Sequence, residues 1–200
     1  ITPGLDAGDI LAQEAVDIGV AETTGELEAR LAPLGARLCL DVIQRMKAGP
    51  VSGTKQDPAL VTKAPKLKKE HGLIDWTQPA EKIAWHVRAM QPWPTAYTFF
   101  HRPGKKPMRV IVCRIRSTAA TSHIHASGLT PGLLASVKPY PDEPGVMMVN
   151  CGGATAVLVS ELLPEGKKRM TAEEFLRGYP IQDGYRFGPE ILASGATPPA

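Results

Sequence analysis

Two aspartates near the start of the chain are the residues best suited to acid–base chemistry. Asp6 and Asp9 lie in the segment ITPGLDAGDIL, where Gly4 and Gly8 flank them. Glycine permits positive φ angles and close backbone approach, so this spacing predicts a tight loop that fixes both carboxylates. A carboxylate held in such a loop can transfer a proton or orient a water molecule. The alternative is an ordinary surface turn with solvated acids.

The segment after this loop predicts elements that would position it. Residues 10–18 are expected to form a strand, and Thr23 with Glu26 has the spacing of a helix capping box. Pro33 should divide the following helical pattern into two helices, 25–32 and 34–48. An apolar face at helical spacing is expected to be core, formed by Leu27, Leu31, Leu34, Leu38 and Val42.

Length and composition favour a protein of one or two domains. The chain has 200 residues, of which 43% are hydrophobic. No apolar run approaches the roughly 18 residues of a membrane span, and no basic-then-apolar leader opens the chain. The three cysteines are Cys39, Cys113 and Cys151, an odd number without the spacing of a metal site. We expect them to be reduced thiols that fill the core of a cytoplasmic protein. We also expect the protein to be a monomer.

The charge is unevenly distributed along the chain. Residues 1–49 carry 4 basic and 8 acidic side chains, residues 50–120 carry 13 and 4, and residues 121–200 carry 6 and 8. A central block this basic indicates an anionic partner, with nucleic acid the leading candidate. The alternative is a linker whose lysines only keep it solvated. The candidate RNA-binding residues are Lys66, Lys68, Lys69, Lys105, Lys106, Lys167, Lys168 and Arg169.

The remainder of the sequence predicts a linker followed by a small barrel. Glycines and prolines indicate a linker at 49–70, and Thr77 is expected to cap a helix that runs to about Met90. Trp93, held between two prolines, should plug the core of the next domain; stacking on a nucleotide is the alternative. Five short strands then favour a barrel of the oligonucleotide-binding (OB) type, at 96–101, 108–116, 132–138, 145–150 and 155–163.

Three further features of the second half of the chain can be interpreted. Thr171 and Glu174 form a second capping box, which starts a helix at 171–177 that Gly178 ends. His123 and His125 have a spacing that could bind a metal ion, but the sequence around them contains no third ligand, so we expect no metal site. Residues 191–200 are predicted to be a disordered tail.

Four motifs resemble the methionyl-tRNA formyltransferase family. They are Gly-Leu-Asp-x-Gly-Asp-Ile-Leu at 4–11, Gly-x-Ile-Asp-Trp at 72–76, Arg-Ala-x-x-Pro-Trp-Pro at 88–94 and Gly-Lys-Lys-Arg-Met at 166–170. The resemblance implies the α/β end of a Rossmann-like catalytic domain at 1–48, the basic linker, and an OB-like tRNA-binding barrel with flanking helices at 71–190.

The resemblance also implies a reaction and its substrates. The formyl donor would be 10-formyltetrahydrofolate and the acceptor the amino group of initiator methionyl-tRNA. Asp6 would serve the transfer, and Gly4, Leu5, Asp6 and Asp9 would lie at the folate. The family's other catalytic groups are an asparagine and a histidine close together, whereas the single asparagine here is Asn150.

Because the chain starts at Ile1, with nothing before the Asp6 loop for it to pack against, we expect the chain to be a fragment of a longer protein. Because the asparagine–histidine pair is missing, we also expect it to be inactive alone. Two alternatives remain open. One is a tRNA-binding module without catalysis, and the other is a folate-dependent formyltransferase or hydrolase with a different acceptor.

Overall fold

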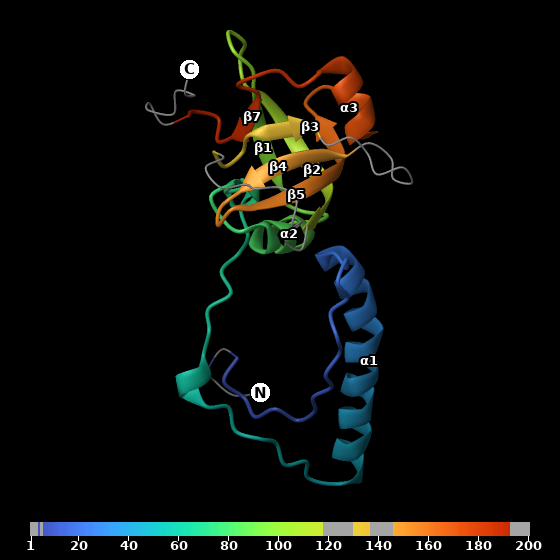
Figure 1. Cartoon of the computed structure of the whole chain (residues 1–200). Helices are drawn as coiled ribbons and strands as arrows, with labels where there is room; N and C mark the ends of the chain where they lie inside the picture. Colours follow the sequence, from blue (N-terminus) through green and yellow to red (C-terminus); the bar gives the residue numbers. More distant parts are fainter. Residues whose placement is uncertain (1–3, 5, 118–129, 137–145, 193–200) are drawn as a thin grey trace. The chain divides into compact units, whose positions relative to one another are not determined.

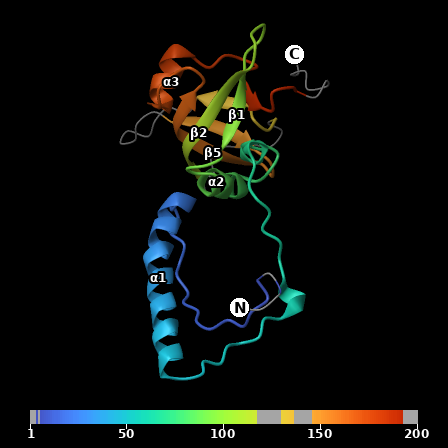
Figure 2. The ribbon, with the colours of Figure 1, turned by 180° about the vertical axis from the view of Figure 1, so that it is seen from behind.

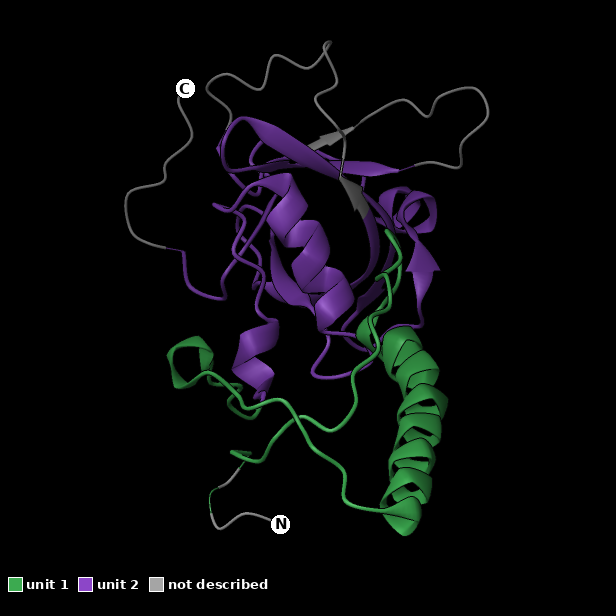
Figure 3. Ribbon diagram, turned by 90° about the horizontal axis from the view of Figure 1, so that it is seen from below, with its two compact units in different colours: residues 1–66 green, residues 67–200 purple. Residues whose placement is uncertain are grey.

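The computed structural model describes residues 4, 6–117, 130–136 and 146–192. The chain divides into two compact units, Ile1–Lys66 and Leu67–Ala200 (Figure 3). Each is described by itself below. The boundary falls inside the segment that the sequence predicted to be a linker.

Unit 1 contains one long helix, α1 (Thr24–Ala48). The predicted capping box is confirmed, because Thr23 and Glu26 exchange hydrogen bonds, and the chain leaves the helix at Gly49. The predicted division into two helices is wrong. Pro33 lies inside α1 and removes a single backbone donor, which the helix-forming residues on either side outweigh. The segment that follows α1 within unit 1, residues 49–66, is called the connector below, and it contains the short 3-10 helix η1 (Pro58–Leu60).

The predicted strand at 10–18 is also wrong. Only Ile10 makes a β-bridge, to Thr54, and the next residues run extended beside α1 (Figure 1). Arginines of the helix hold this segment: Arg45 donates 2.8 Å to the carbonyl of Leu11, and Arg30 donates 2.7 Å to that of Asp17. Between them, Arg37 pairs with Glu14. Side-chain bonds to a helix replace the strand partners that the described part of unit 1 lacks.

The apolar face of α1 is not a core within this unit. No residue of α1 is buried, and Leu31 is 39% exposed. Cys39 is exposed as well, so its predicted role as a core filler is wrong. The helix meets an extended segment instead of a sheet among the described residues, and one segment covers too little surface to bury a helical face.

Unit 2 begins with two short helices, followed by strands and one further helix. The 3-10 helix η2 (Lys69–Gly72) leads to α2 (Ala80–Ala89). The strands are β1 (Tyr97–His101), β2 (Met108–Ser117), β3 (Leu134–Ser136), β4 (Met147–Cys151), β5 (Thr155–Pro164), β6 (Met170–Thr171) and β7 (Arg186–Gly188). Helix α3 (Ala172–Gly178) follows β6, with the predicted capping box of Thr171 and Glu174.

These strands form a nearly closed antiparallel barrel. Their order is β3-β4-β5-β2-β1-β7, with β6 beside β5, and every pair is antiparallel. Figure 2 shows β1 and β2 side by side. Bonds between the two edges close the sheet: Phe187 donates 2.8 Å to Gly132, and Leu134 donates 3.2 Å to Tyr185. The five predicted strands are all present among the described residues, although parts of two of them, residues 137–138 and 145, lie outside that range. Strands β6 and β7 were not predicted, because they are too short to show alternation.

Aromatic side chains fill the barrel. Phe100 is fully buried and meets Phe175, Phe187 and two tyrosines edge to face. The predicted plug, Trp93, is 52% exposed, whereas Trp76 is 4% exposed, so Trp76 fills that role. The reason is local. The chain turns at residues 90–94 directly after α2, and the turn buries Pro94 while the indole of Trp93 faces outward.

Thr77 does not cap α2. Its main-chain N–H and hydroxyl both donate to Asp75, and Pro79 occupies the cap position. The hydroxyl of Thr155 accepts the bond from Ala80 N–H at 2.8 Å instead. An oxygen from β5, distant in sequence, therefore satisfies the start of this helix.

Candidate catalytic loop and RNA-binding surface

The loop that carries Asp6 is tied to the connector within unit 1. The side-chain amide of Gln56 donates to the carbonyl oxygens of Asp6 at 2.9 Å and Gly8 at 2.7 Å. Just beyond the loop, the Ile10 bridge consists of two backbone bonds to Thr54, of 2.9 and 3.0 Å. Four hydrogen bonds thus fix a short segment that lacks regular structure.

The unusual backbone conformation of this loop lies at Asp6 itself and not at a flanking glycine among the described residues. Asp6 itself has a positive φ of 52°, an uncommon conformation that aspartate tolerates better than most residues. Asp6 and Asp9 are both exposed. Leu5 lies outside the described residues, and a Cβ added at Gly4 would lie 3.1 Å from the Cβ of Ala7. The loop therefore presents its carboxylates to solvent from a held backbone.

Two residues that position the loop escaped the sequence analysis. Gln56 is the first. The second is Gly53, where an added Cβ would lie 2.6 Å from the Cβ of Asp9 and 2.9 Å from a methyl of Leu11. Such distances leave no room for a side chain, so the connector can approach the loop only with glycine here. The sequence does contain a glycine at this position, between Ser52 and Thr54, which is compatible with close packing. Its neighbours in sequence did not indicate that it packs against the Asp6 loop.

Five of the predicted RNA-binding residues lie at one end of the barrel. Lys105 and Lys106 belong to the turn between β1 and β2, while Lys167, Lys168 and Arg169 belong to the turn between β5 and β6. The two turns lie toward the same end of the barrel because the start of β2 pairs with the end of β5: Val110 lies opposite Pro164. All five side chains are exposed. Antiparallel pairing thus gathers two basic turns that are far apart in sequence.

The other predicted lysines lie elsewhere. Lys68 and Lys69 are at η2, which leads into Leu73 and its bridge with Tyr97. Tyr97 begins β1, whereas the turn with Lys105 follows the end of that strand, so these lysines lie toward opposite ends of β1. Lys66 is the last residue of unit 1. The structure therefore does not gather all eight predicted residues into one patch.

Arg169 differs from its neighbours because an acid already holds it. Its Nε donates 2.7 Å to a carboxylate oxygen of Glu161, and a second guanidinium nitrogen contacts the same group. Because two guanidinium nitrogens of Arg169 already contact one carboxylate oxygen of Glu161, Arg169 is less available to a phosphate. The four lysines at this end of the barrel are thus better candidates for phosphate contacts than the arginine.

The described residues contain neither a metal-binding cluster nor a membrane-spanning helix. Within these ranges, no three His, Cys, Asp or Glu side chains gather in a way that would hold a metal ion. His123 and His125 lie outside the described residues. In the part of the chain that the structure describes, no helix has the length and hydrophobicity that a bilayer crossing requires.

The cysteines of the barrel have different surroundings. Cys151 is 3% exposed and packs in the core, as the sequence predicted. Burial raises the pKa of its thiol to about 12, so this sulfur stays protonated at neutral pH. Cys113 is half-buried, and burial raises its pKa as well. At both cysteines burial therefore disfavours the thiolate, the form that acts as a nucleophile.

Comparison with known proteins identifies the family. Residues 66–180 match the family model described as formyl transferase, C-terminal domain. The chain is similar to methionyl-tRNA formyltransferase of Bacillus licheniformis, with 36% identity over 92% of this chain and 54% of the relative. It is also similar to that of Citrifermentans bemidjiense, with 38% identity over 96% of this chain and 55% of the relative. The chain spans about half the length of these curated relatives.

Solved structures show the same fold at lower identity. A variant of HypX from Aquifex aeolicus superposes with a TM-score of 0.56 and 17% identity, over 90% of this chain and 29% of that chain. HypX in complex with tetrahydrofolic acid gives a TM-score of 0.51 and 13% identity, over 88% and 28%. The match of the family model to more than half of the sequence leads to one conclusion: the chain belongs to the formyl transferase family, through its C-terminal domain.

Proposed function

We propose that this chain takes part in transferring a formyl group from 10-formyltetrahydrofolate to the amino group of initiator methionyl-tRNA. The observation that carries the proposal is the similarity to methionyl-tRNA formyltransferases, which reaches 38% identity and extends beyond the barrel to 96% of this chain. The motifs at 72–76, 88–94 and 166–170 lie within residues 66–180, the range that the family model matches. The donor is a substrate, and no metal takes part.

In this proposal Asp6 manages the proton of the reaction. The amino group of methionine attacks the formyl carbon, a new C–N bond forms, and the bond from that carbon to the folate nitrogen breaks. The proton lost by the amine passes to the leaving nitrogen, directly or through water, by way of the Asp6 carboxylate. The held loop supports this role, because Gln56 restrains the backbone on both sides of Ala7. Gly4, Leu5 and Asp9 would border the donor.

The barrel, as an OB-like domain, would bind the tRNA. Lys105, Lys106, Lys167 and Lys168 would contact phosphates at one end, with Arg169 contributing less because of Glu161. Lys66, Lys68 and Lys69 would add contacts along the approach to the barrel. Contacts of this kind supply affinity and depend on salt, with little reading of base sequence. The protein would act as a cytoplasmic monomer.

A specific observation favours the alternative of binding without catalysis for this chain. Asp6 is exposed, and Gly4, Asp6 and Asp9 do not line the cavity that segments 73–77 and 186–189 form in unit 2. A formyl transfer site needs donors that stabilise an oxyanion and exclude water. The isolated chain would accordingly bind tRNA and transfer nothing. A different acceptor, such as a sugar nucleotide, receives less support, because the similar curated proteins are named for methionyl-tRNA.

The test is an assay of the 200-residue chain with 10-formyltetrahydrofolate and methionyl-tRNA, alongside a titration with methionyl-tRNA and with a UDP-sugar. We expect binding of the tRNA that weakens steeply with salt, no binding of the UDP-sugar, and no formylated product. Absence of tRNA binding at low salt would refute the proposal, and formyl transfer by the chain alone would refute its inactivity.

A further inference from the structure

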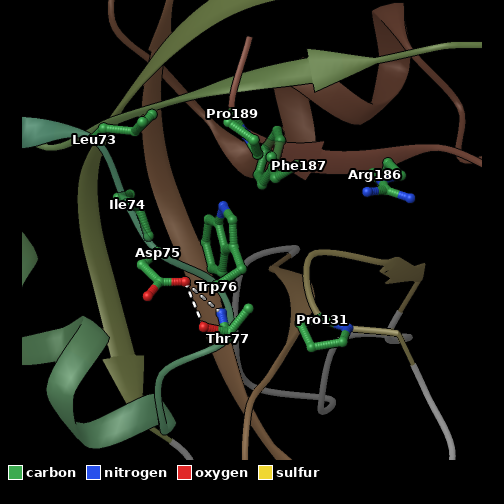
Figure 4. A pocket seen from close by; sticks show the side chains of 10 residues that line it. Leu73, Ile74, Asp75, Trp76, Thr77, Pro131, Arg186, Phe187 and Pro189 are labelled. Atoms are coloured by element: carbon green, nitrogen blue, oxygen red, sulfur yellow. Dashed lines mark hydrogen bonds between the residues drawn. The ribbon is translucent and has the colours of Figure 1, made fainter. Parts of the chain in front are cut away.

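A cavity of about 290 Å³ lies in unit 2. Two separate segments form its walls, 73–77 and 186–189, together with Pro131 (Figure 4). None of the residues predicted to bind RNA lines it. The lining residues are Leu73, Ile74, Asp75, Trp76, Thr77, Pro131, Arg186, Phe187, Gly188 and Pro189.

The walls are rigid, aromatic and largely apolar. Trp76 and Phe187 stack with their centroids 5.6 Å apart, and both are buried. The indole Nε1 of Trp76 donates 2.9 Å to the hydroxyl of Thr98, which fixes the orientation of the ring. Pro131 and Pro189 add two stiff surfaces. Pockets of this kind favour flat, rigid ring systems, because little conformational entropy is lost when such a ring binds.

Opposite charges border this apolar hollow. Figure 4 shows Asp75 and Arg186 on opposite sides of Trp76. The Nε of Arg186 is buried and, among the described residues, has no hydrogen-bond partner. Asp75 accepts bonds from Thr77 and Gln78, and the Thr77 hydroxyl lowers the pKa of this carboxyl. The pocket therefore offers a cation with a free donor and a carboxylate that stays ionised at neutral pH.

The surroundings indicate what kind of molecule reaches the pocket. Helix η2 ends at Gly72, so Lys68 and Lys69 precede the lining residue Leu73 by only a few positions. A polyanion held by these lysines would pass the mouth of the pocket. The volume is at the small end for ligand sites, which suits one ring system with its sugar and excludes two stacked nucleotides.

We propose that this pocket binds one unpaired nucleotide of an RNA strand. The base lies in the hollow beside Trp76 and Phe187, and the adjoining phosphate meets the guanidinium of Arg186. The inference rests on the proposed binding of tRNA and adds to it a site for a single-stranded nucleotide. A base inside a duplex cannot enter the pocket, whereas the exposed lysines accept paired and unpaired RNA alike.

The test compares two RNA hairpins, identical except that one carries a short single-stranded 3′ overhang. Anisotropy titrations at fixed ionic strength use the full chain and two variants that each lose one positive charge, Arg186→Gln and the matched control Arg177→Gln. Arg177 is exposed on α3 and does not line the pocket. We expect the overhang to strengthen binding about tenfold, a preference that Arg186→Gln removes and Arg177→Gln retains.

A second measurement uses the unmodified chain. The Nε1–H resonance of Trp76 should shift on addition of the overhang hairpin and stay in place with the blunt one. Equal affinity for both hairpins would overturn the pocket proposal and leave the proposed tRNA binding intact. Failure of both hairpins to bind at low salt would overturn both. Binding of free AMP that Arg186→Gln abolishes, without preference between the hairpins, would replace the RNA strand with a free nucleotide.

Discussion

The side-chain amide of Gln56 donates a hydrogen bond of 2.9 Å to the main-chain carbonyl of Asp6. The same amide reaches Gly8 at 2.7 Å, so a single side chain of the connector spans the predicted catalytic residue. The contact acts on the backbone and leaves the Asp6 carboxylate unoccupied by Gln56. The connector thereby positions the loop without competing for the group that is proposed to move the proton.

Replacement of Gln56 by alanine should loosen this loop. Both bonds are lost, and the backbone at Asp6 retains its positive φ with less support. Backbone ¹⁵N relaxation of residues 6–9 should show order parameters that fall from values near 0.85 toward 0.6. Gln44→Ala, in exposed α1, is the matched control and should change nothing in the loop. Unchanged relaxation in Gln56→Ala would show that the bonds do not hold the segment.

Gly152 is expected to be intolerant of any side chain. An added Cβ would lie 1.6 Å from the carbonyl oxygen of Thr77, a backbone atom that cannot move aside without displacing the start of α2. Gly152→Ala should therefore destabilise the barrel by about 1–3 kcal/mol or more. Gly178→Ala meets no atom within 4 Å at the end of α3 and should stabilise by about 0.4–1 kcal/mol. Urea unfolding of both variants measures the difference, and equal midpoints would contradict it.

The bond between Trp76 and Thr98 should contribute measurably to stability. Thr98 is fully buried, accepts from the indole and donates 3.0 Å to the carbonyl of Gly188. Thr98→Val keeps the shape and leaves both partners unsatisfied, which should cost about 1–3 kcal/mol. A double-mutant cycle with Trp76→Phe isolates the indole bond. Additive effects of the two changes would mean that the bond contributes nothing.

His101 should titrate below its usual pKa of 6.5. Burial lowers the pKa of its imidazole, and the nearby charge of Arg186 lowers it further, although the contact with the Pro189 carbonyl opposes both. Below pH 6.5 the unfolded chain binds the proton more readily, so the stability given by neutral His101 is present above that pH and lost as the pH falls. Arg186→Gln should raise the pKa in an NMR titration, whereas Arg177→Gln should not. A pKa unaffected by Arg186→Gln would exclude the electrostatic cause.

The sequence carried most of the local information about this fold. Capping boxes at Thr23 and Thr171 marked their helices, because the bonds involved lie within three residues. The five main strands followed from their composition and turns. The break predicted at Pro33 does not occur, because the cost of one missing backbone donor is outweighed by the helical residues on both sides. The sequence analysis predicted that Trp93 fills the core, whereas Trp76 does so in the structure. Which tryptophan is buried depends on which part of the chain closes the barrel.

The candidate sites depended on contacts that sequence alone does not contain. The glycines around Asp6 indicated a loop, but its support by Gln56 joins residues 50 positions apart. The lysines were found by composition, whereas their meeting at one end required the pairing of β2 with β5. The pocket at Trp76 joins segments from opposite ends of unit 2. One of its walls consists of β7 and Pro189, and the sequence did not predict this strand.

The salt dependence of tRNA binding tests the central claim most directly. Lys105→Ala/Lys106→Ala removes two charges from the basic end of the barrel, and Lys47→Ala/Lys82→Ala removes two from the exposed surfaces of α1 and α2. If the barrel end contacts phosphates, the first variant should bind methionyl-tRNA more weakly and lower the slope of log affinity against log salt by about 2, while the second keeps both. Identical affinities and slopes for the two variants would contradict a tRNA-binding surface at this end of the barrel.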